Sequence, residues 1–459
     1  MDPGRSVSLH WSNVTRPTMS LGENPLITLL LSDSLRGRLA RGTIWSAVGA
    51  ALAQGLGLAA SIATARLLGQ AGFGEFGMVR STVLMVGVLG GSGLGTAATK
   101  HLAEHRLTDP ARAGRQIGLL ESTGALLGGA ATLFCLLFAA PLARVAINAP
   151  QLTGPLRLAA FLILLSVLGG IQRGALVGLE RFRTVAWLNL VDGILNFALV
   201  VPGVWKFGLS GGVAGLVAAA VVGTAIKSLV LRRECRHHGI PVRHRGVRGE
   251  SAILWSFALP ALLVGISTFP FEWLARLPLT RHLGAFEELG IFAAAYSWGP
   301  AVMFLPSQIV APAIPLMAGL YATKDFRLFL RLARTTVLLS LALGIAAAAC
   351  LGLFSGAIMK AYGPSFASHR IVLVILLAAY AVASGTTLNT VFLAAGRMWL
   401  LALQYGIWGA VLVGASYVLR KHGAAGLSFS YLVSYGVLLA IQLVCARALF
   451  SRSRLEATS

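Results

Sequence analysis

The sequence predicts an all-α integral membrane protein with about twelve membrane-spanning helices in two six-helix lobes. Hydrophobic residues make up 56% of the 459 positions and charged residues only 12%, whereas about a quarter of the residues in a soluble domain are charged. The mean hydropathy is +0.77. The apolar residues form stretches of about 20, the length that crosses the hydrocarbon core of a bilayer, and basic residues collect in alternate gaps between these stretches.

Twelve apolar stretches are long enough to span a membrane. The fourth is the weakest, because only residues 158–172 are free of charge and the flanking Arg157 and Arg173 must reach the two interfaces. The predicted spans cover residues 43–68, 81–99, 117–140, 155–177, 185–204, 209–231, 253–274, 289–316, 335–359, 371–394, 399–419 and 427–446.

The charges set the orientation of these spans. The formal net charge is +22, which in a soluble protein would suggest a nucleic-acid partner. With a cytoplasmic amino terminus, 27 of the 38 basic residues fall on the cytoplasmic side, where Lys227 is counted with the loop after the sixth span. Because cytoplasmic loops are enriched in Lys and Arg, this bias predicts two cytoplasmic termini. It also predicts contact with anionic membrane lipids and no nucleic-acid partner.

The spans and loops divide the chain into five segments. They are a cytoplasmic N-terminal segment (1–42), an N-lobe with spans one to six (43–231), a basic cytoplasmic linker (232–250), a C-lobe with spans seven to twelve (251–447) and a cytoplasmic tail (448–459). Either Met1 or Met19 can be the true start. The four cysteines have no spacing typical of disulfide or metal frameworks, so we expect structural roles for them.

A short internal repeat relates the two halves. RLLG at 66–69 is followed by GEFG at 74–77, and RHLG at 281–284 is followed by ELG at 288–290. Each copy lies between the first and second spans of its half, and each half has an even number of spans. The repeat is therefore parallel, about an axis along the membrane normal, although the low identity leaves chance as the alternative.

The second span of each half contains residues that disturb a helix. Gly91 and Gly93 lie in a glycine-rich run in the first half, and Pro300 and Pro306 lie in the second. Glycine lowers helix rigidity and proline removes a backbone donor, so we expect both spans to bend or break within the membrane. Broken helices in corresponding positions of two halves are typical of transport sites. The alternative is that the regularly spaced glycines allow close helix packing.

Four charged residues fall within the predicted spans or at their ends: Glu121, Asp192, Glu272 and Arg276. A charge near the bilayer centre costs about 2.5 to 3.5 kcal/mol, so each needs a partner or a wet cavity. Glu272 and Arg276 are four residues apart and can pair on one helix face. The three acids are candidates for proton coupling or gating, with neutralisation, snorkelling or a hydrogen bond between helices as the alternatives.

Four outer arginines surround the first two spans of the two lobes: Arg66, Arg80, Arg276 and Arg281. If those four spans line a central cavity, its walls are cationic and suit an anion such as a diphosphate, which arginine binds bidentately. Ordinary anchoring at the membrane interface is the alternative.

Motifs for covalent chemistry are sparse. Residues 101–105 read HLAEH, which matches the H-x-x-E-H zinc pattern, but no third ligand follows and basic residues flank it, so we predict no metal site. The sequence has no G-x-x-x-x-G-K-[ST] phosphate loop. We therefore expect neither ATP hydrolysis nor a cofactor.

Three segments carry a family resemblance: RLLGQAGFGEFG at 66–77, GGSGLGTAATK at 90–100 and GALVGLERF at 174–182. In these segments the chain resembles the Wzx-type polysaccharide flippases of the multidrug, oligosaccharidyl-lipid and polysaccharide exporter superfamily. The resemblance implies a V-shaped pair of lobes that alternates between inward-open and outward-open states. It implies an undecaprenyl-diphosphate-linked oligosaccharide as substrate, the bacterial inner membrane as location, and polysaccharide assembly proteins as partners.

Two other functions remain as alternatives. A cation-coupled multidrug exporter of the same superfamily typically has an acidic residue in the first or seventh span. Here the first span has none and Glu272 is the acid of the seventh. A membrane glycan polymerase or ligase is disfavoured because every predicted outer loop is short.

Overall fold

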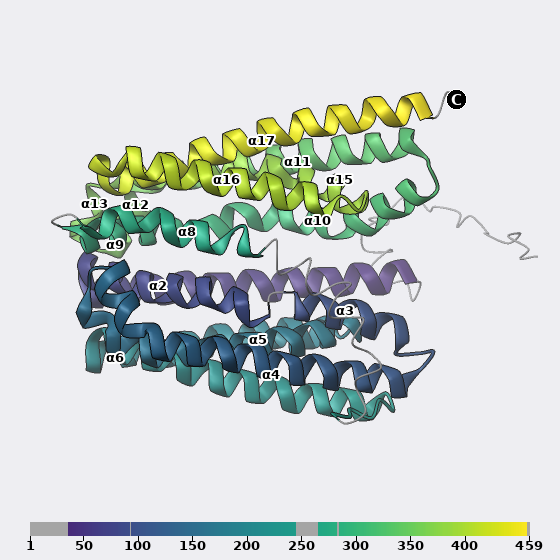
Figure 1. Cartoon of the computed structure of the whole chain (residues 1–459), viewed down its shortest axis with the longest axis horizontal. Coiled ribbons are helices and arrows are strands. Elements are labelled where there is room, and N and C mark those ends of the chain that lie inside the picture. The colour runs from purple at the N-terminus through teal and green to yellow at the C-terminus, as the bar shows by residue number, and fades with distance from the viewer. Residues whose placement is uncertain (1–34, 92, 245–264, 282–283, 457–459) are drawn as a thin grey trace, which may run out of the picture.

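The computed structural model describes residues 35–91, 93–244, 265–281 and 284–456. Every regular element in these residues is a helix, and the long helices run side by side in two bundles (Figure 1). The N-lobe is drawn in purple to teal and the C-lobe in green to yellow. Most of the predicted N-terminal segment, the start of the seventh span and the end of the tail lie outside the described residues.

The bounds of the elements are as follows. The N-lobe contains α2 (Leu35–Gly87), η1 (Val88–Gly90), α3 (Leu94–His105), α4 (Pro110–Pro141), η2 (Leu142–Ala146), η3 (Pro150–Leu152), α5 (Thr153–Gly178) and α6 (Phe182–His237). The C-lobe contains α8 (Phe269–Arg276), η6 (Leu277–Arg281), α9 (Ala285–Tyr296), α10 (Gly299–Ala322), α11 (Phe326–Leu353), α12 (Ser355–Tyr362), α13 (Pro364–Ala367), α14 (Arg370–Gly385), η7 (Thr386–Leu388), α15 (Asn389–Ala394), α16 (Met398–Val418), η8 (Arg420–His422) and α17 (Gly423–Glu456).

Two of the long elements are hairpins of two helices. A straight helix of 56 residues, the length of α6, would measure about 84 Å at 1.5 Å per residue, far more than the roughly 30 Å hydrocarbon core. The chain of α6 reverses at Phe207 and Gly208, whose φ is 59°. After the reversal, the backbones of Gly203 and Gly211 lie against each other. Helix α2 reverses in the same way at Gly69.

The number of spans agrees with the sequence. The described residues hold nine segments that are long and apolar enough to cross a membrane. Two of these are the hairpins α2 and α6, which raises the count to eleven, and α8 is the end of the twelfth span. The predicted fold class, twelve helices in two lobes, is confirmed.

The parallel repeat appears in the geometry of the contact between the lobes. Gly69 and Gly284 have φ of 70° and 75°, and each precedes the second helix of its lobe. Gly74 of α2 packs against the backbone of Phe286, and Gly290 of α9 packs against the backbone of Gln70. Residues 70 and 286, like 74 and 290, are 216 positions apart, so the two contacts are equivalent under exchange of the lobes.

The second helix of each lobe is broken, at different depths. In the N-lobe, α2 passes through η1 to Gly91 and Gly93, with φ of 129° and 105°, before α3 begins. In the C-lobe the break at residues 297–298 separates α9 from α10, and Pro300 lies in the first turn of α10. Pro306 lies inside α10 without interrupting it, because membrane helices can accommodate proline through local adjustment and neighbouring groups. Of the two expected outcomes, a bend or a break, the second span of the C-lobe has its break at residues 297–298 and not at Pro306.

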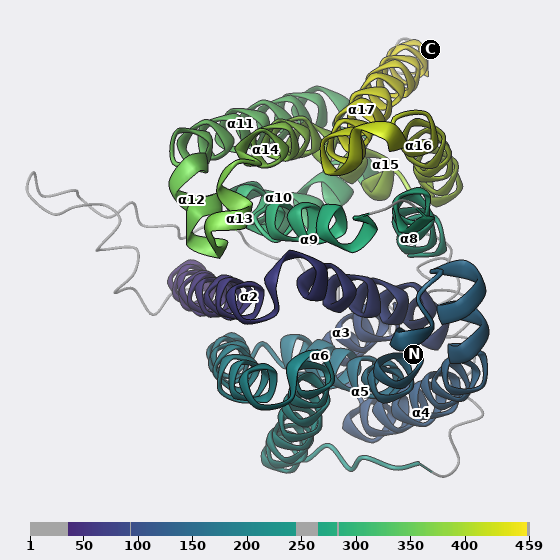
Figure 2. The same ribbon diagram turned by 90° about the vertical axis from the view of Figure 1, so that its left-hand side faces the viewer.

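The beginning of the linker between the lobes is attached to α4. Helix α6 continues to His237, so the predicted linker starts as helix. The chain then runs across α4 (Figure 2), with its backbone against Gly114 and Gly118. The Arg243 N–H donates to the Gly114 carbonyl at 3.3 Å. The missing side chains of the two glycines allow this close approach, and we call residues 239–244 the strap.

Candidate functional site

The two lobes contact each other at one end of the molecule, which we call the closed end (left in Figure 1, facing the viewer in Figure 2). Arg66 Nε donates to the Ala361 carbonyl at 2.5 Å, and Gln70 Nε2 donates to the Ser365 carbonyl at 2.8 Å. The rings of Phe73 and Tyr362 lie 6.3 Å apart. Together with the glycine crossing of α2 and α9, these contacts hold the lobes together.

A cavity of about 330 Å³ lies between the lobes, farther into the molecule than the contacts at the closed end. The first two helices of each lobe line it. The N-lobe contributes α2 residues from Gln54 to Leu84, and the C-lobe contributes residues from Phe269 to Pro300 on α8, α9 and α10. Trp273 Nε1 donates to Thr82 Oγ1 at 2.9 Å and links the lobes through two buried side chains. The cavity thus lies between the two lobes and not within either of them.

Glu272 and Arg276 form an ion pair on one side of the cavity. Arg276 lies 3.6 Å from Glu272 Oε2, and both side chains are mostly buried. The Tyr296 hydroxyl donates to the same carboxylate oxygen at 2.8 Å. The Arg276 guanidinium also lies over the Tyr296 ring, 5.0 Å from its centre. This arrangement stabilises both charges, since a cation above an aromatic face is attracted to it.

Arg80 extends into the same cavity from α2, where its side chain is accessible. It forms no ion pair with any carboxylate of the described residues. The charged residues among the described cavity walls are Arg80, Glu272 and Arg276, so the walls carry a net charge of +1. An excess cation in a low-dielectric cavity attracts an anionic ligand.

The four candidate arginines do not lie together. Arg80 and Arg276 share the cavity, whereas Arg66 lies at the closed end with Ala361 as its partner. Arg281 is exposed at the end of η6 and lies outside the cavity walls. Proximity in the sequence to the first two spans therefore does not place the four arginines at one site.

The family follows from a comparison of sequences. The profile of the family described as polysaccharide biosynthesis protein matches residues 39–321, more than half of the chain. The chain belongs to this family.

Individual relatives agree with this assignment. The EPS I polysaccharide export inner membrane protein EpsE of Ralstonia nicotianae is 26% identical over 383 residues, covering 81% of this chain and 85% of EpsE. The Lipid III flippase of Escherichia coli is 26% identical over 297 residues, covering 62% of this chain and 69% of the flippase. The fold is similar to an inward-facing multidrug transporter of the MATE family, with a TM-score of 0.73 and 15% identity over 87% of this chain and 95% of that one. This polysaccharide biosynthesis protein is therefore a membrane transporter and not an enzyme.

Asp192 has a partner that the sequence did not indicate. In this transporter, Lys227 Nζ lies 2.7 Å from Asp192 Oδ2 and 2.8 Å from Oδ1, and joins the two helices of the α6 hairpin. Asn196 donates to the Asp192 carbonyl at 2.8 Å. Lys227 is thus a helix residue rather than a loop residue. Both members of the pair lie outside the walls of the central cavity.

Glu121 lies farther from the helix end than its predicted span implies, because α4 already begins at Pro110. Asp109 caps this start by accepting from the Arg112 N–H at 2.9 Å. Glu121 Oε2 lies 3.2 Å from Nε2 of His244, the last residue of the strap. Its observed contact is therefore with the linker between the lobes and not with the cavity.

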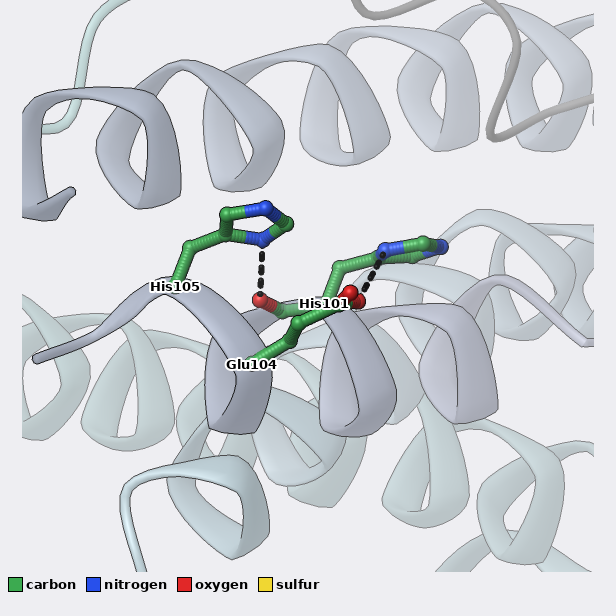
Figure 3. A group of neighbouring side chains, drawn as sticks. All are labelled: His101, Glu104 and His105. Atoms are coloured by element: carbon green, nitrogen blue, oxygen red, sulfur yellow. Dashed lines mark hydrogen bonds and ion pairs between the residues drawn. The ribbon is translucent and has the colours of Figure 1, made fainter. Parts of the chain in front are cut away.

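The H-x-x-E-H residues lie on one face of α3 (Figure 3). One possible ligand atom from each lies within 4.8 Å of the others. His101 Nδ1 is 3.5 Å from Glu104 Oε2, and His105 Nδ1 is 3.1 Å from the His101 carbonyl. These three residues offer three possible ligand atoms, whereas a structural zinc site has four protein ligands. One of the ring nitrogens, His105 Nδ1, already lies at a backbone carbonyl.

Lys227, Tyr296 and the pair of Thr82 and Trp273 were not predicted from the sequence. A usable signal existed for Lys227. Residues 192 and 227 are 15 and 19 positions from the reversal at residues 207–208, so a hairpin places them at similar depth. No comparable signal exists for Thr82 and Trp273, which are 191 residues apart and meet only through the packing of the lobes.

Proposed function

We propose that this protein flips an oligosaccharide linked to undecaprenyl diphosphate across the bacterial inner membrane, by alternating access, during polysaccharide biosynthesis. The observation that carries the proposal is the cavity with Arg80 and Arg276 on opposite lobes. Two guanidinium groups that face one cavity from different lobes can hold a diphosphate, since each forms paired, charge-assisted hydrogen bonds. The relatives supply the substrate class, because one is an EPS I export protein and another a Lipid III flippase.

The charge balance of the cavity favours this substrate over a cationic drug. Glu272, the acid among the described cavity walls, is already paired with Arg276 and bonded to Tyr296. Arg80 therefore supplies the uncompensated charge. A cationic substrate would meet repulsion there, while an anion gains a partner without displacing an existing one.

The conformation fits one step of such a cycle. With both termini in the cytoplasm, the closed end faces the periplasm, and the cavity lies on the cytoplasmic side of the contacts there. In this state the substrate enters from the inner leaflet. Rocking of the lobes, as in other transporters built from repeats, then opens the closed end and releases the glycan outside.

Transport of a labelled lipid-linked oligosaccharide in proteoliposomes tests the proposal. We expect Arg80→Ala to lower transport by about 10- to 100-fold, since a hydrogen bond to a charged group is worth about 1.5 to 3 kcal/mol. Arg80→Lys keeps the charge but loses the paired hydrogen bonds, so we expect its transport rate to lie between those of the wild-type protein and Arg80→Ala. Arg144→Ala, which removes an exposed arginine outside the cavity, serves as control. The proposal fails if the wild-type protein moves none of the lipid-linked glycans that its host assembles.

A further inference from the structure

A second hollow of about 440 Å³ continues from the central cavity into the N-lobe. It shares Arg80, Leu84 and Phe269 with the cavity. From Arg80 it follows α2, η1 and the start of α3 as far as Thr96, a distance of about 24 Å at the rise of a helix. Residues of α5 form the facing wall. We call this hollow the side groove.

Glycine residues leave the space that forms the side groove. Five of its wall residues are glycines, among them Gly87 of α2 and Gly170 of α5. A Cβ atom added at either of these two positions would meet nothing within 4 Å. The break in the second helix, at Gly91 and Gly93, lies along the same wall. Irregular backbone within a membrane protein occurs where it is enclosed by protein or lines a cavity. The broken segment of the second helix meets this condition because it forms part of the groove wall.

The chemistry of the side groove differs from that of the central cavity. Arg80, at its junction with the cavity, is the charged residue among the described groove walls, and the hydroxyls of Thr96 and Ser166 are its polar side chains. The other described wall residues are aliphatic, aromatic or glycine. A ligand that extends from Arg80 into the groove is therefore anionic at one end and hydrocarbon along its length.

We propose that the side groove holds the part of the polyprenyl chain next to the diphosphate while the diphosphate contacts Arg80. This inference rests on the proposed function and adds the location of the lipid portion of the substrate. The groove contributes little affinity, because the chain leaves an equally apolar bilayer. It orients the chain beside the second helix, so that the diphosphate stays at Arg80 when the lobes move.

Leucine at the two open glycines tests this assignment. Gly87→Leu and Gly170→Leu place a side chain in the groove without a backbone clash, while Gly129→Leu adds the same side chain at an open position of α4 outside the groove. We expect each groove variant to transport the undecaprenyl-linked glycan about tenfold more slowly, the scale of overpacking effects. We expect the control to retain the wild-type rate. Binding of the same glycan on a methyl diphosphate, which lacks the chain, stays unchanged in all three variants.

The outcomes separate the two proposals. If the wild-type protein transports the glycan and the groove variants do so equally well, the groove assignment is overturned and the proposed function stands. If the groove variants weaken binding of the methyl diphosphate glycan as much as they slow transport, the groove acts on the head group and the assignment is also overturned. Absence of wild-type transport removes the proposed function itself.

Photochemical labelling of the wild-type protein provides a measurement that does not depend on folding of a variant. A polyprenyl diphosphate with a benzophenone on its first isoprene units should label the α5 segment 162–170, which contains Leu162, Ser166 and Gly170 of the groove wall. Excess unlabelled polyprenyl diphosphate should suppress the labelling. Labelling confined to the C-lobe would place the chain elsewhere and reject the assignment.

Discussion

Substitution of Gly290 by alanine should open the closed end. The new Cβ would lie well inside van der Waals contact with the Gln70 carbonyl and 3.1 Å from the Gly74 nitrogen. These are backbone atoms of a helix, which cannot rotate away as a side chain can, so α2 and α9 must separate. Overpacking of this kind costs about 1 to 3 kcal/mol. The penalty acts only where the lobes touch, so the population of the closed state relative to the open state should fall about 5- to 150-fold.

Distance measurements between spin labels can detect this shift. Lys206 and Lys421 are exposed near the closed end on different lobes, and Lys206→Cys with Lys421→Cys provides attachment sites after the four native cysteines are replaced. We expect the short-distance population of the Gly290→Ala protein to shrink and a longer one to appear. Alanine also raises helix propensity by up to about 1 kcal/mol. Gly436→Ala, where a Cβ meets nothing within 4 Å, controls for that effect. A distance distribution identical to the control would refute the glycine crossing as the closing contact.

Three further predictions concern charged groups. Arg276→Ala should lower the free energy of unfolding by about 3 kcal/mol because it leaves buried Glu272 without its cation. Adding Glu272→Gln should recover part of that loss in thermal unfolding, and no recovery would contradict the pairing. Lys227→Met should destabilise the N-lobe by a similar amount of about 3 kcal/mol, and Asp192→Asn in the same chain should restore most of it; additive losses would exclude a stabilising pair. Excess Zn²⁺ should leave the unfolding temperature unchanged because the motif at His101 offers too few ligands; a rise abolished by His101→Ala would establish a metal site.

The fold was largely predictable because its determinants act locally along the chain. Apolar length fixed the number of spans, and the two arginine–glycine segments before the second helices marked the repeat. Gly69 and Gly284, at its ends, have the positive φ that glycine adopts without strain. Helix ends were harder: the second span starts just after Gly69, about ten residues before its predicted start, because polar residues can continue a helix where the other lobe covers them.

The site was predictable only in part. Arg80 and Arg276 were candidates because they are basic residues beside the first two predicted spans of the lobes, and both line the cavity. Arg66 could not be distinguished from them, since its position depends on a carbonyl 295 residues away. Tyr296 was not predicted, because an aromatic residue in an apolar helix usually belongs to the hydrophobic core. Its hydrogen bond to the Glu272 carboxylate is visible only in the structure. Contacts between lobes thus decide which of several similar residues face the cavity.

The strap attaches the chain that follows α6 to the third membrane helix of the N-lobe. Although α6 ends at His237, the chain stays fixed to α4 through Gly114, Gly118 and the contact between Glu121 and His244. A pull on the chain at His244 would therefore act on α4, the third membrane helix, before it acts on the end of α6. The end of α6 is thereby connected to a second helix of its own lobe, and a displacement of one helix would be passed to the other.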